Sequence, residues 1–200
     1  MKKGLIISII FIVALLFFVL PYSWKTLNKA VSLDEEAKAA WSQVENNYER
    51  RYDLIPNLVA TVKGYASHEE KVLTEVTEKR ASVGQIKLSM DDLNNPAKME
   101  AFQKAQSELS GALSRLMVVA EKYPELKANE HFMNLQSQLE GTENRIAVAR
   151  KDYIEKVRDY NKYLRTIPAK WILSAFGDFE KKEEYKIEEA KKVVPQVKFD

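Results

Sequence analysis

The sequence of 200 residues lacks cysteine altogether, and this absence excludes disulfide bonds and thiolate metal sites. Glycine is scarce as well: the six glycines stand apart from one another, so no glycine-rich loop is available to cradle a phosphate. No charge of one sign dominates, because the net charge of +2 comes from a dense mixture of acidic and basic residues. No basic face is predicted, and nucleic acid is not expected as a partner.

Histidine is also rare, and this scarcity bears on metal and catalytic sites. Only His68 and His131 are present. A zinc-protease helix needs a second histidine four residues after the first, but Val72 stands four residues after His68. A carboxylate-bridged di-iron bundle needs a glutamate three residues before each histidine, but Tyr65 and Ala128 stand there. The sequence therefore predicts no enzyme, no metal and no cofactor.

The residues that are present are typical of long helices. Hydrophobic residues make up 46% of the chain and charged residues 30%, with only six prolines. A length of 200 residues suits one domain with an appendage, because single domains usually contain about 100–200 residues.

The N-terminal segment is predicted to be a membrane anchor. After two lysines, an apolar run extends from Leu5 to Leu20 with Ser8 as its single polar residue. A helix needs about 20 residues to cross a bilayer, and residues 4–24 supply that length. The side chains expected to lie in lipid are Leu5, Ile6, Ile10, Phe11, Leu15, Phe18, Leu20 and Trp24.

A cleaved signal peptide is the alternative to this signal anchor. Both have a positively charged start and an apolar middle, but Pro21, Tyr22 and Trp24 are bulky where small residues would guide cleavage. We therefore expect a single crossing of the cell membrane. Lysines flank both ends of the run in nearly equal number, with a slight lean towards a cytoplasmic bundle.

Apolar residues recur three and four positions apart along residues 37–83, 99–123 and 132–167. This spacing predicts helices that pack through coiled-coil-like seams. The second stretch follows Asn95 and Pro96, a pair that favours the start of a helix. Short connections between such helices make neighbours antiparallel.

The predicted fold is all-α and has four parts. An N-terminal transmembrane helix at residues 1–24 is followed by a linker at residues 25–32. An antiparallel up-and-down bundle of long helices, of four-helix type, occupies residues 33–168. Residues 169–200 are expected to form a short amphipathic segment and a charged, solvated tail. Trp171 in that segment is expected to pack against the end of the bundle, with contact to lipid or to a partner as the alternative.

Pro56 interrupts the first apolar stripe. A proline inside a helix costs about 3 kcal/mol, so the helix is expected to be kinked near Pro56 or to restart there with Asp53 as its cap. The apolar spacing also slips between Tyr48 and Tyr52 before it resumes.

A change of direction at this proline would alter which neighbours the following residues meet. Asn57 and Tyr65 would face a different helix from the one that Trp41 faces. Gly64 would permit close contact between helices.

Polar residues are embedded in the apolar stripes at two places. Those around the proline are Asn47, Arg50, Arg51, Asp53 and Asn57. In the third stretch Thr142 falls where an apolar residue is expected, Gly141 leaves room for a neighbouring backbone, and Glu143, Asn144 and Arg145 flank it. These side chains either form an interhelical layer of hydrogen bonds and ion pairs or are ordinary flanking charges. A ligand pocket built from them is a further alternative.

Two long blocks of the sequence resemble the LemA family of bacterial membrane proteins. They read "YDLIPNLVATVKGYASHE" and "LSRLMVVAEKYPELKANEHFMNLQSQLEGTENRIAVAR". The resemblance covers residues 41–167 and continues through "YNKYLRTIPAKWILSAFG", although the family more often has phenylalanine at the position of Ile167. It implies a single N-terminal membrane helix, a four-helix-type bundle, and no established activity or cofactor. Genes for similar proteins often lie beside genes for membrane metalloproteases or other membrane proteins, so the resemblance implies a partner in protein complexes of the cell envelope.

These observations lead to one functional hypothesis and two alternatives. The hypothesis is a membrane-anchored, non-enzymatic bundle that acts as a scaffold or adaptor for other envelope proteins, with self-association as a further mode of interaction. The first alternative is a sensory bundle that binds a small ligand between its helices. The second is a metal-dependent hydrolase that uses His68 and His131.

Overall fold

A computed structural model describes residues 2–86, 88, 90–176, 179–183 and 185. The helices are α1 (Lys2–Tyr65), α2 (Glu70–Gln85), the short 3-10 helix η1 (Met90–Asn94), α3 (Pro96–Ala120), α4 (Pro124–Lys127), α5 (Glu130–Arg165) and α6 (Ala169–Phe176). No strand occurs among the described residues. The all-α prediction is therefore confirmed.

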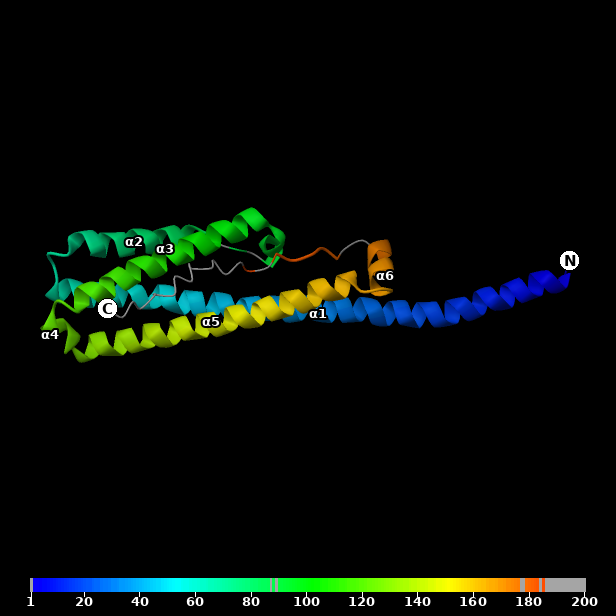
Figure 1. The fold of residues 1–200 in the computed structure, drawn as a ribbon, viewed down its shortest axis with the longest axis horizontal. Coiled ribbons are helices and arrows are strands. Elements are labelled where there is room, and N and C mark those ends of the chain that lie inside the picture. Colours follow the sequence, from blue (N-terminus) through cyan, green and yellow to red (C-terminus); the bar gives the residue numbers. More distant parts are fainter. Residues whose placement is uncertain (1, 87, 89, 177–178, 184, 186–200) are drawn as a thin grey trace, which may run out of the picture.

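Four long helices form the bundle in alternating directions. α1 and α5 lie antiparallel along most of the length of the bundle, and the α2–α3 hairpin packs beside the C-terminal half of α1 (Figure 1). The N-terminal part of α1 extends beyond the other helices, and α6 stands across α1 at the end of α5 (Figure 1).

Side-chain caps explain where two of these helices begin. The Asn95 side chain accepts hydrogen bonds from the amides of Ala97 and Lys98 at 3.1 and 3.2 Å, and Pro96 occupies the first turn, where no intrahelical partner is lost. The Asn129 side chain accepts a hydrogen bond from the amide of Phe132 at 3.0 Å. The helix start predicted after Asn95 is thus confirmed.

α1 is one continuous helix of 64 residues that contains both Pro21 and Pro56. The prediction that a helix restarts near Pro56 with Asp53 as its cap is wrong, because the helix continues on both sides of that residue. The expected linker at residues 25–32 also lies within α1, where Thr26 and Ala30 are buried. A change of axis direction at Pro56 stays a prediction.

The N-terminal part of α1 has apolar side chains with no protein around them. Ile10, Phe11, Phe18, Leu20 and Trp24 are all exposed. The predicted lipid-facing residues also include Ile6, which is exposed, and Leu5 and Leu15, whose side chains lie outside the described part of the chain. Among the helices as described, none is both long enough and apolar enough to cross a membrane.

The bundle core has two halves that meet end to end. The aliphatic core gathers buried residues such as Leu58 and Val62 of α1, Leu109 and Leu116 of α3 and Leu139 of α5. The aromatic core, nearer the N-terminal extension, is built around Trp41, Tyr48, Phe102, Tyr153 and Tyr185. A small third cluster joins Ala30 of α1 to Ala169 and Leu173 of α6.

Candidate functional site

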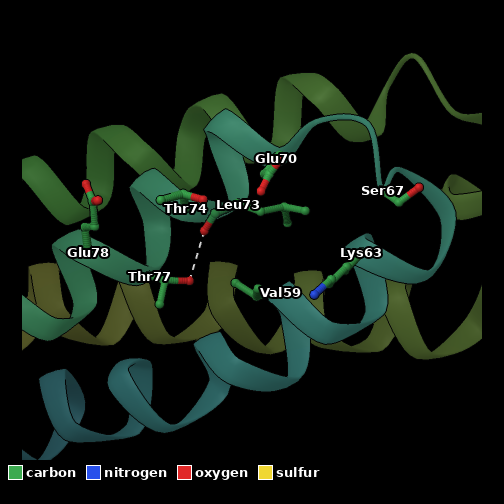
Figure 2. A pocket seen from close by; sticks show the side chains of 8 residues that line it. All are labelled: Val59, Lys63, Ser67, Glu70, Leu73, Thr74, Thr77 and Glu78. Carbon is green, nitrogen blue, oxygen red and sulfur yellow. Dashed lines mark hydrogen bonds between the residues drawn. The ribbon is translucent and has the colours of Figure 1, made fainter.

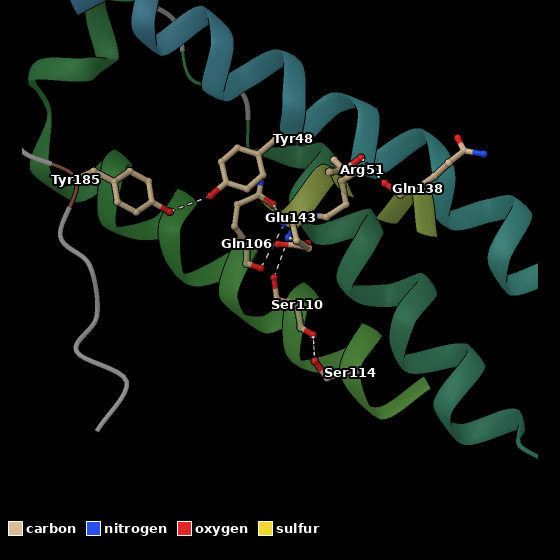
Figure 3. Close-up of polar contacts among 9 residues, drawn as sticks. Tyr48, Arg51, Gln106, Ser110, Ser114, Gln138, Glu143 and Tyr185 are labelled. Carbon is tan, nitrogen blue, oxygen red and sulfur yellow. Dashed lines mark hydrogen bonds and ion pairs between the residues drawn. The ribbon is translucent and has the colours of Figure 1, made fainter. Parts of the chain in front are cut away.

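The most distinctive polar feature of the bundle is the buried guanidinium of Arg51 on α1. The residue is only 1% exposed. Its Nη1 donates to Ser110 Oγ at 2.7 Å and to Glu143 Oε1 at 2.6 Å. Its Nη2 donates to the side-chain oxygen of Gln106 and, at 3.5 Å, to the Gln106 backbone carbonyl. Figure 3 shows these groups converging from α1, α3 and α5.

We call Arg51, Gln106, Ser110, Thr142 and Glu143 the polar layer. A buried charge is tolerated only when it is paired and hydrogen-bonded, and Glu143 supplies the opposite charge from a partly exposed position. Thr142 is fully buried, and its hydroxyl donates to the Gln138 carbonyl of its own helix at 2.7 Å. Three helices are thereby fixed at one level along their axes.

The polar layer lies at the boundary between the two halves of the core. On α1 it separates Tyr48 of the aromatic core from Ile55 of the aliphatic core. On α5 it separates Ile146 from Leu139 in the same way. Of the residues singled out around Thr142, Glu143 makes an interhelical contact, with Arg51, whereas the Thr142 hydroxyl bonds within its own helix.

The remaining residues singled out near Thr142 lie outside the layer. Asn144 and Arg145 are exposed. Gly141 does not meet a neighbouring backbone: a Cβ atom there would meet only the Arg145 side chain of the same helix, at 3.3 Å. On α5 only Thr142 and Glu143 belong to the polar layer, and the neighbouring residues point away from it.

Several of the residues singled out at and around the proline are exposed. Asp53, Pro56 and Asn57 face outward. A Cβ atom added at Gly64 would meet no other atom within 4 Å, so this glycine makes no close helix contact. Tyr65 is different, because its hydroxyl accepts a hydrogen bond from Asn129 Nδ2 at 2.9 Å. It ties the end of α1 to the cap of α5.

Pro56 is accommodated by a side chain from α2. A proline has no amide hydrogen, so the carbonyl of Tyr52, four residues earlier, loses its helical donor. Arg80 Nε donates to that carbonyl at 3.0 Å, and the guanidinium lies over the Tyr52 ring at 3.7 Å. The Tyr52 hydroxyl in turn leaves no room for a side chain at Gly84, where a Cβ atom would lie 2.9 Å from it. Pro56 therefore marks the place where α2 docks on α1.

A C-terminal segment without helix or strand packs on the aromatic core; we call its described residues, 179–183 and 185, the strap. Asn161 holds the backbone of Lys182 at two points: its side chain donates to the carbonyl at 2.9 Å and accepts from the amide at 3.0 Å. The Tyr185 and Tyr48 hydroxyls are 3.0 Å apart. The expectation of a solvated tail does not hold for Lys182 and Tyr185, which are buried. Residues 186–200 of the predicted tail lie outside the described residues.

Charge also holds the strap in place. Lys182 Nζ lies 2.7 Å from Asp34 Oδ1 and 5.3 Å from the centre of the Tyr160 ring. Burial alone would raise the pKa of Asp34, but hydrogen bonds and charge from Lys182 and Lys38 together lower it below its ordinary value. Burial raises the pKa of Tyr160 to about 12. Protonation of Asp34 in acid would therefore weaken its ion pair with Lys182 of the strap.

Burial also suppresses ionisation of the tyrosines in the aromatic core. It raises the pKa of Tyr48, with the neighbouring Tyr185 hydroxyl adding to the effect. It raises the pKa of Tyr153 as well, whose hydroxyl donates to the Glu183 carbonyl at 3.5 Å. Neutral hydroxyls of this kind are structural hydrogen-bonding groups rather than proton carriers near pH 7.

Two hollows adjoin these elements. One of about 800 Å³ borders the polar layer at Gln106 and the aromatic core at Trp41, and Glu45 and Glu49 lie at its exposed side. A second of about 470 Å³ lies between α1 and α2 (Figure 2). Its lining residues are Val59, Lys63, Ser67, Glu70, Leu73, Thr74, Thr77 and Glu78.

The two histidines take no part in the polar layer. His68, in the turn before α2, and His131, on α5, are both exposed. Within the described part of the chain, no three histidine, aspartate or glutamate side chains come together as metal ligands. The two terminal nitrogens of the buried Arg51 have partners on α3 and α5, whereas its Nε has no hydrogen-bond partner among the described residues.

Comparison with known proteins agrees with the resemblance noted in the sequence. Residues 40–199 match the profile of the LemA family. This chain belongs to the LemA family. Among curated proteins, magnetosome proteins MamQ 1 and MamQ 2 of Paramagnetospirillum magneticum (strain ATCC 700264 / AMB-1) are each 26% identical to it over 197 residues, covering 90% of this chain and 70% of the relative. The family match takes in the polar layer, the strap and α6, and begins after the exposed apolar part of α1.

Sequence reasoning missed Gln106 and Ser110, the partners of Arg51 on α3. A signal for Gln106 was present, because it stands in the apolar stripe between Phe102 and Leu109 at intervals of four and three residues. Arg51 likewise stands between Tyr48 and Ile55 at intervals of three and four. The apparent slip in the first stripe is therefore no slip, since the stripe continues through a charged residue.

Proposed function

We propose that this LemA-family protein is a membrane-anchored helical bundle that binds other envelope proteins and catalyses no reaction. The observation that carries the proposal is the exposed apolar part of α1, which continues without a break into the packed bundle. Apolar surface in water is unfavourable by about 25 cal/mol per Å². Lipid would remove that cost, and the same helix would then hold the bundle at the membrane surface.

Aromatic residues at the end of the apolar run support lipid anchoring. Tyr22 and Trp24 are both exposed and follow Leu20 directly, where a membrane–water interface would favour them. Lys25 and Lys29 come next and are exposed to solvent. A single crossing, with the bundle on the cytoplasmic side, is the finer form of this proposal.

Anchoring is tested with the full-length chain in native membranes. We expect the protein to stay with the membranes after alkaline carbonate extraction, whereas Phe11→Lys/Phe18→Lys is released. Val118→Lys/Val148→Lys is the matched control, since both valines are exposed on the bundle. Release of the wild-type chain would overturn the proposal. Single cysteines placed at the two ends of the apolar run can be labelled with membrane-impermeant thiol reagents added to one face of the membrane or the other. Labelling of the two ends from opposite faces would show that the helix crosses the membrane, and the face that labels each end gives the orientation.

An adaptor role is supported by the rigidity of the bundle and by the names of the relatives. The polar layer, the strap and the Arg80 contact each fix helices to one another, which suits a surface that partners recognise. The relatives are named for the magnetosome rather than for a reaction. Cross-linking in native membranes followed by identification of the attached proteins tests this role. Recovery of only self-linked chains would favour self-association over an adaptor.

A small ligand is the second candidate, favoured by the hollow beside Gln106. Its volume of about 800 Å³ lies within the range of about 300–1,000 Å³ usual for ligand sites. A true ligand raises the unfolding temperature in a concentration-dependent way. A panel of metabolites that leaves the unfolding temperature unchanged would remove this candidate, and a shift abolished by Gln106→Leu would support it.

A further inference from the structure

We propose that α6 and the turn before it form a second membrane contact that lies on the lipid surface at the base of the bundle. The contact surface consists of Ile167, Lys170 and Trp171, and we call it the collar. This inference rests on the proposed anchoring by α1. It adds a surface of the folded bundle itself, within the region that matches the family.

The collar is the outward face of an amphipathic element. Ala169 and Leu173 are buried against Ala30 of α1, so one side of α6 is fully used in packing. On the other side Ile167 is 66% exposed and Trp171 is 64% exposed. The expectation that Trp171 packs against the end of the bundle is therefore wrong: Ala169 and Leu173 make that contact, and Trp171 faces outward.

The position of α6 brings the collar close to the level where α1 would leave lipid. Ala30 lies six residues after Trp24, which is about 9 Å along a helix axis. A helix with side chains has a radius of about 5–6 Å. The surface of α6 therefore comes within about 4 Å of the level of Trp24, inside an interfacial zone that is about 5–8 Å thick on each side of a bilayer.

The orientation of α6 also fits a membrane plane. Figure 1 shows α6 standing across α1, beyond the end of α5 and on the side of the N-terminal extension. If α1 enters the bilayer along its axis, α6 lies parallel to the surface. Amphipathic helices at membrane surfaces take this orientation.

The chemistry of the collar suits lipid headgroups better than a protein core. Tryptophan is favoured at the membrane–water interface, where its ring is partly in apolar surroundings and its N–H is hydrated. Lys25, Arg165 and Lys170 are exposed at the same end of the molecule and would face anionic headgroups. Continuity with the exposed apolar part of α1 indicates that one lipid surface covers both.

The absence of cysteine makes a site-specific test direct. Ile167→Cys, in the full-length chain, would carry an environment-sensitive nitrobenzoxadiazole probe and be reconstituted into vesicles of phosphatidylcholine and phosphatidylglycerol. Trp24→Cys is the control for anchoring, and Val148→Cys, exposed on α5, is the control for solvent. We expect lipids with a nitroxide near the headgroup to quench the probes at positions 167 and 24 but not the probe at position 148.

Failure of the collar and failure of the anchor give different results. Quenching at position 24 with a solvent-like probe at position 167 overturns the collar and leaves the anchor intact. Absence of quenching at both positions overturns both. A change in the fluorescence of the probe at position 167 that appears only after membrane extract is added would indicate a protein partner. That result would count against lipid as the occupant of the collar.

A second variant tests the role of the tryptophan. Trp171→Ser in the Ile167→Cys background should reduce quenching at position 167, because the collar loses its principal apolar side chain. Trp171 is largely exposed, so this substitution leaves the packing of Ala169 and Leu173 intact. Unchanged quenching would show that Trp171 does not bind lipid and would overturn its part in the collar.

Discussion

The two halves of the bundle core contain different side chains and are closed in different ways. The aliphatic core is enclosed by α1, α2, α3, α4 and α5, and its buried members carry no hydroxyl group. The aromatic core stacks Trp41 edge-on against Phe102 and Tyr153, with ring centroids 5.6 and 5.1 Å away. It is closed partly by the strap, whose Tyr185 belongs to the core.

This difference follows from the chemistry of tyrosine. A buried hydroxyl needs a hydrogen-bond partner, which can be another hydroxyl or a backbone carbonyl. The strap supplies both partners: the Glu183 carbonyl accepts from the Tyr153 hydroxyl, and the Tyr185 hydroxyl lies 3.0 Å from that of Tyr48. In this bundle the hydroxyls of Tyr48 and Tyr153 therefore have their partners on the strap, whereas the buried side chains of the aliphatic core need none.

The largest effects should come from emptying each core in turn. We expect Trp41→Ala to cost about 3–5 kcal/mol and Leu109→Ala about 2–5 kcal/mol of unfolding free energy, measured by urea denaturation. Hydrogen exchange should separate the variants: Trp41→Ala should expose the amides of the strap, whereas Leu109→Ala should leave them protected. Equal loss of protection throughout would show that the two cores are one unit.

The polar layer should give the next largest effect. Gln106→Leu removes a neutral acceptor from a buried guanidinium and is expected to cost about 2–3 kcal/mol, the upper part of the range for a hydrogen bond to a charged group, while Ser110 and Glu143 remain. Arg51→Met/Gln106→Leu removes both groups and should recover most of that loss, with stability measured by urea denaturation. A double variant no more stable than Gln106→Leu would show that the guanidinium contributes through packing instead.

The sequence predicted the helices far better than it predicted the contacts that hold them together. Spacing of three and four residues is a local property, so it revealed the stripes on α1, α3 and α5. The polar layer was only half found, since Thr142 and Glu143 were noted as exceptions in one stripe while Gln106 in another was not. Its assembly requires Arg51, Gln106 and Thr142 to stand at one level, which depends on the register between helices.

The strap and the Pro56 contact were beyond reach for a similar reason. A run such as "EKKEEY" is typical of a solvated segment, and nothing local shows that Asp34 and Asn161 will hold Lys182. Likewise the proline signals only a missing amide. That Arg80 replaces the missing donor is a tertiary fact, and α1 continues through Pro56 where the sequence alone left a restart open.

Releasing the strap should have a moderate effect confined to the aromatic core. Asn161→Ala leaves the amide and carbonyl of Lys182 without partners and is expected to cost about 1–2 kcal/mol. Asn144→Ala, an exposed asparagine on the same helix, should change stability by less than about 0.5 kcal/mol. Hydrogen exchange of residues 179–185 reports the release directly. Full protection of these amides in Asn161→Ala would contradict the assigned contact.

Acid should loosen the same region by a smaller amount. The pKa of Asp34 is lower in the folded chain than its unfolded value of about 3.9, so its contribution is complete above that pH and is lost as pH falls through the folded pKa. Strap amides should therefore lose protection in acid before the amides of the aliphatic core. Asp34→Asn should weaken the strap at neutral pH and remove the acid step. If the loss of protection in acid persists in Asp34→Asn, another carboxylate is responsible for it.

The smallest expected effect tests how α2 compensates for Pro56 at the edge of the aliphatic core. Arg80→Ala should cost about 1 kcal/mol, because the Tyr52 carbonyl loses the donor that replaces the missing amide. In a Pro56→Ala background the restored amide supplies that carbonyl, so the same change should cost less. The double-mutant cycle, measured by urea denaturation, should therefore give a favourable coupling between Pro56 and Arg80. Equal costs in both backgrounds would mean that Arg80 acts only through its contact with the Tyr52 ring, and the continuity of α1 at Pro56 would then need another cause.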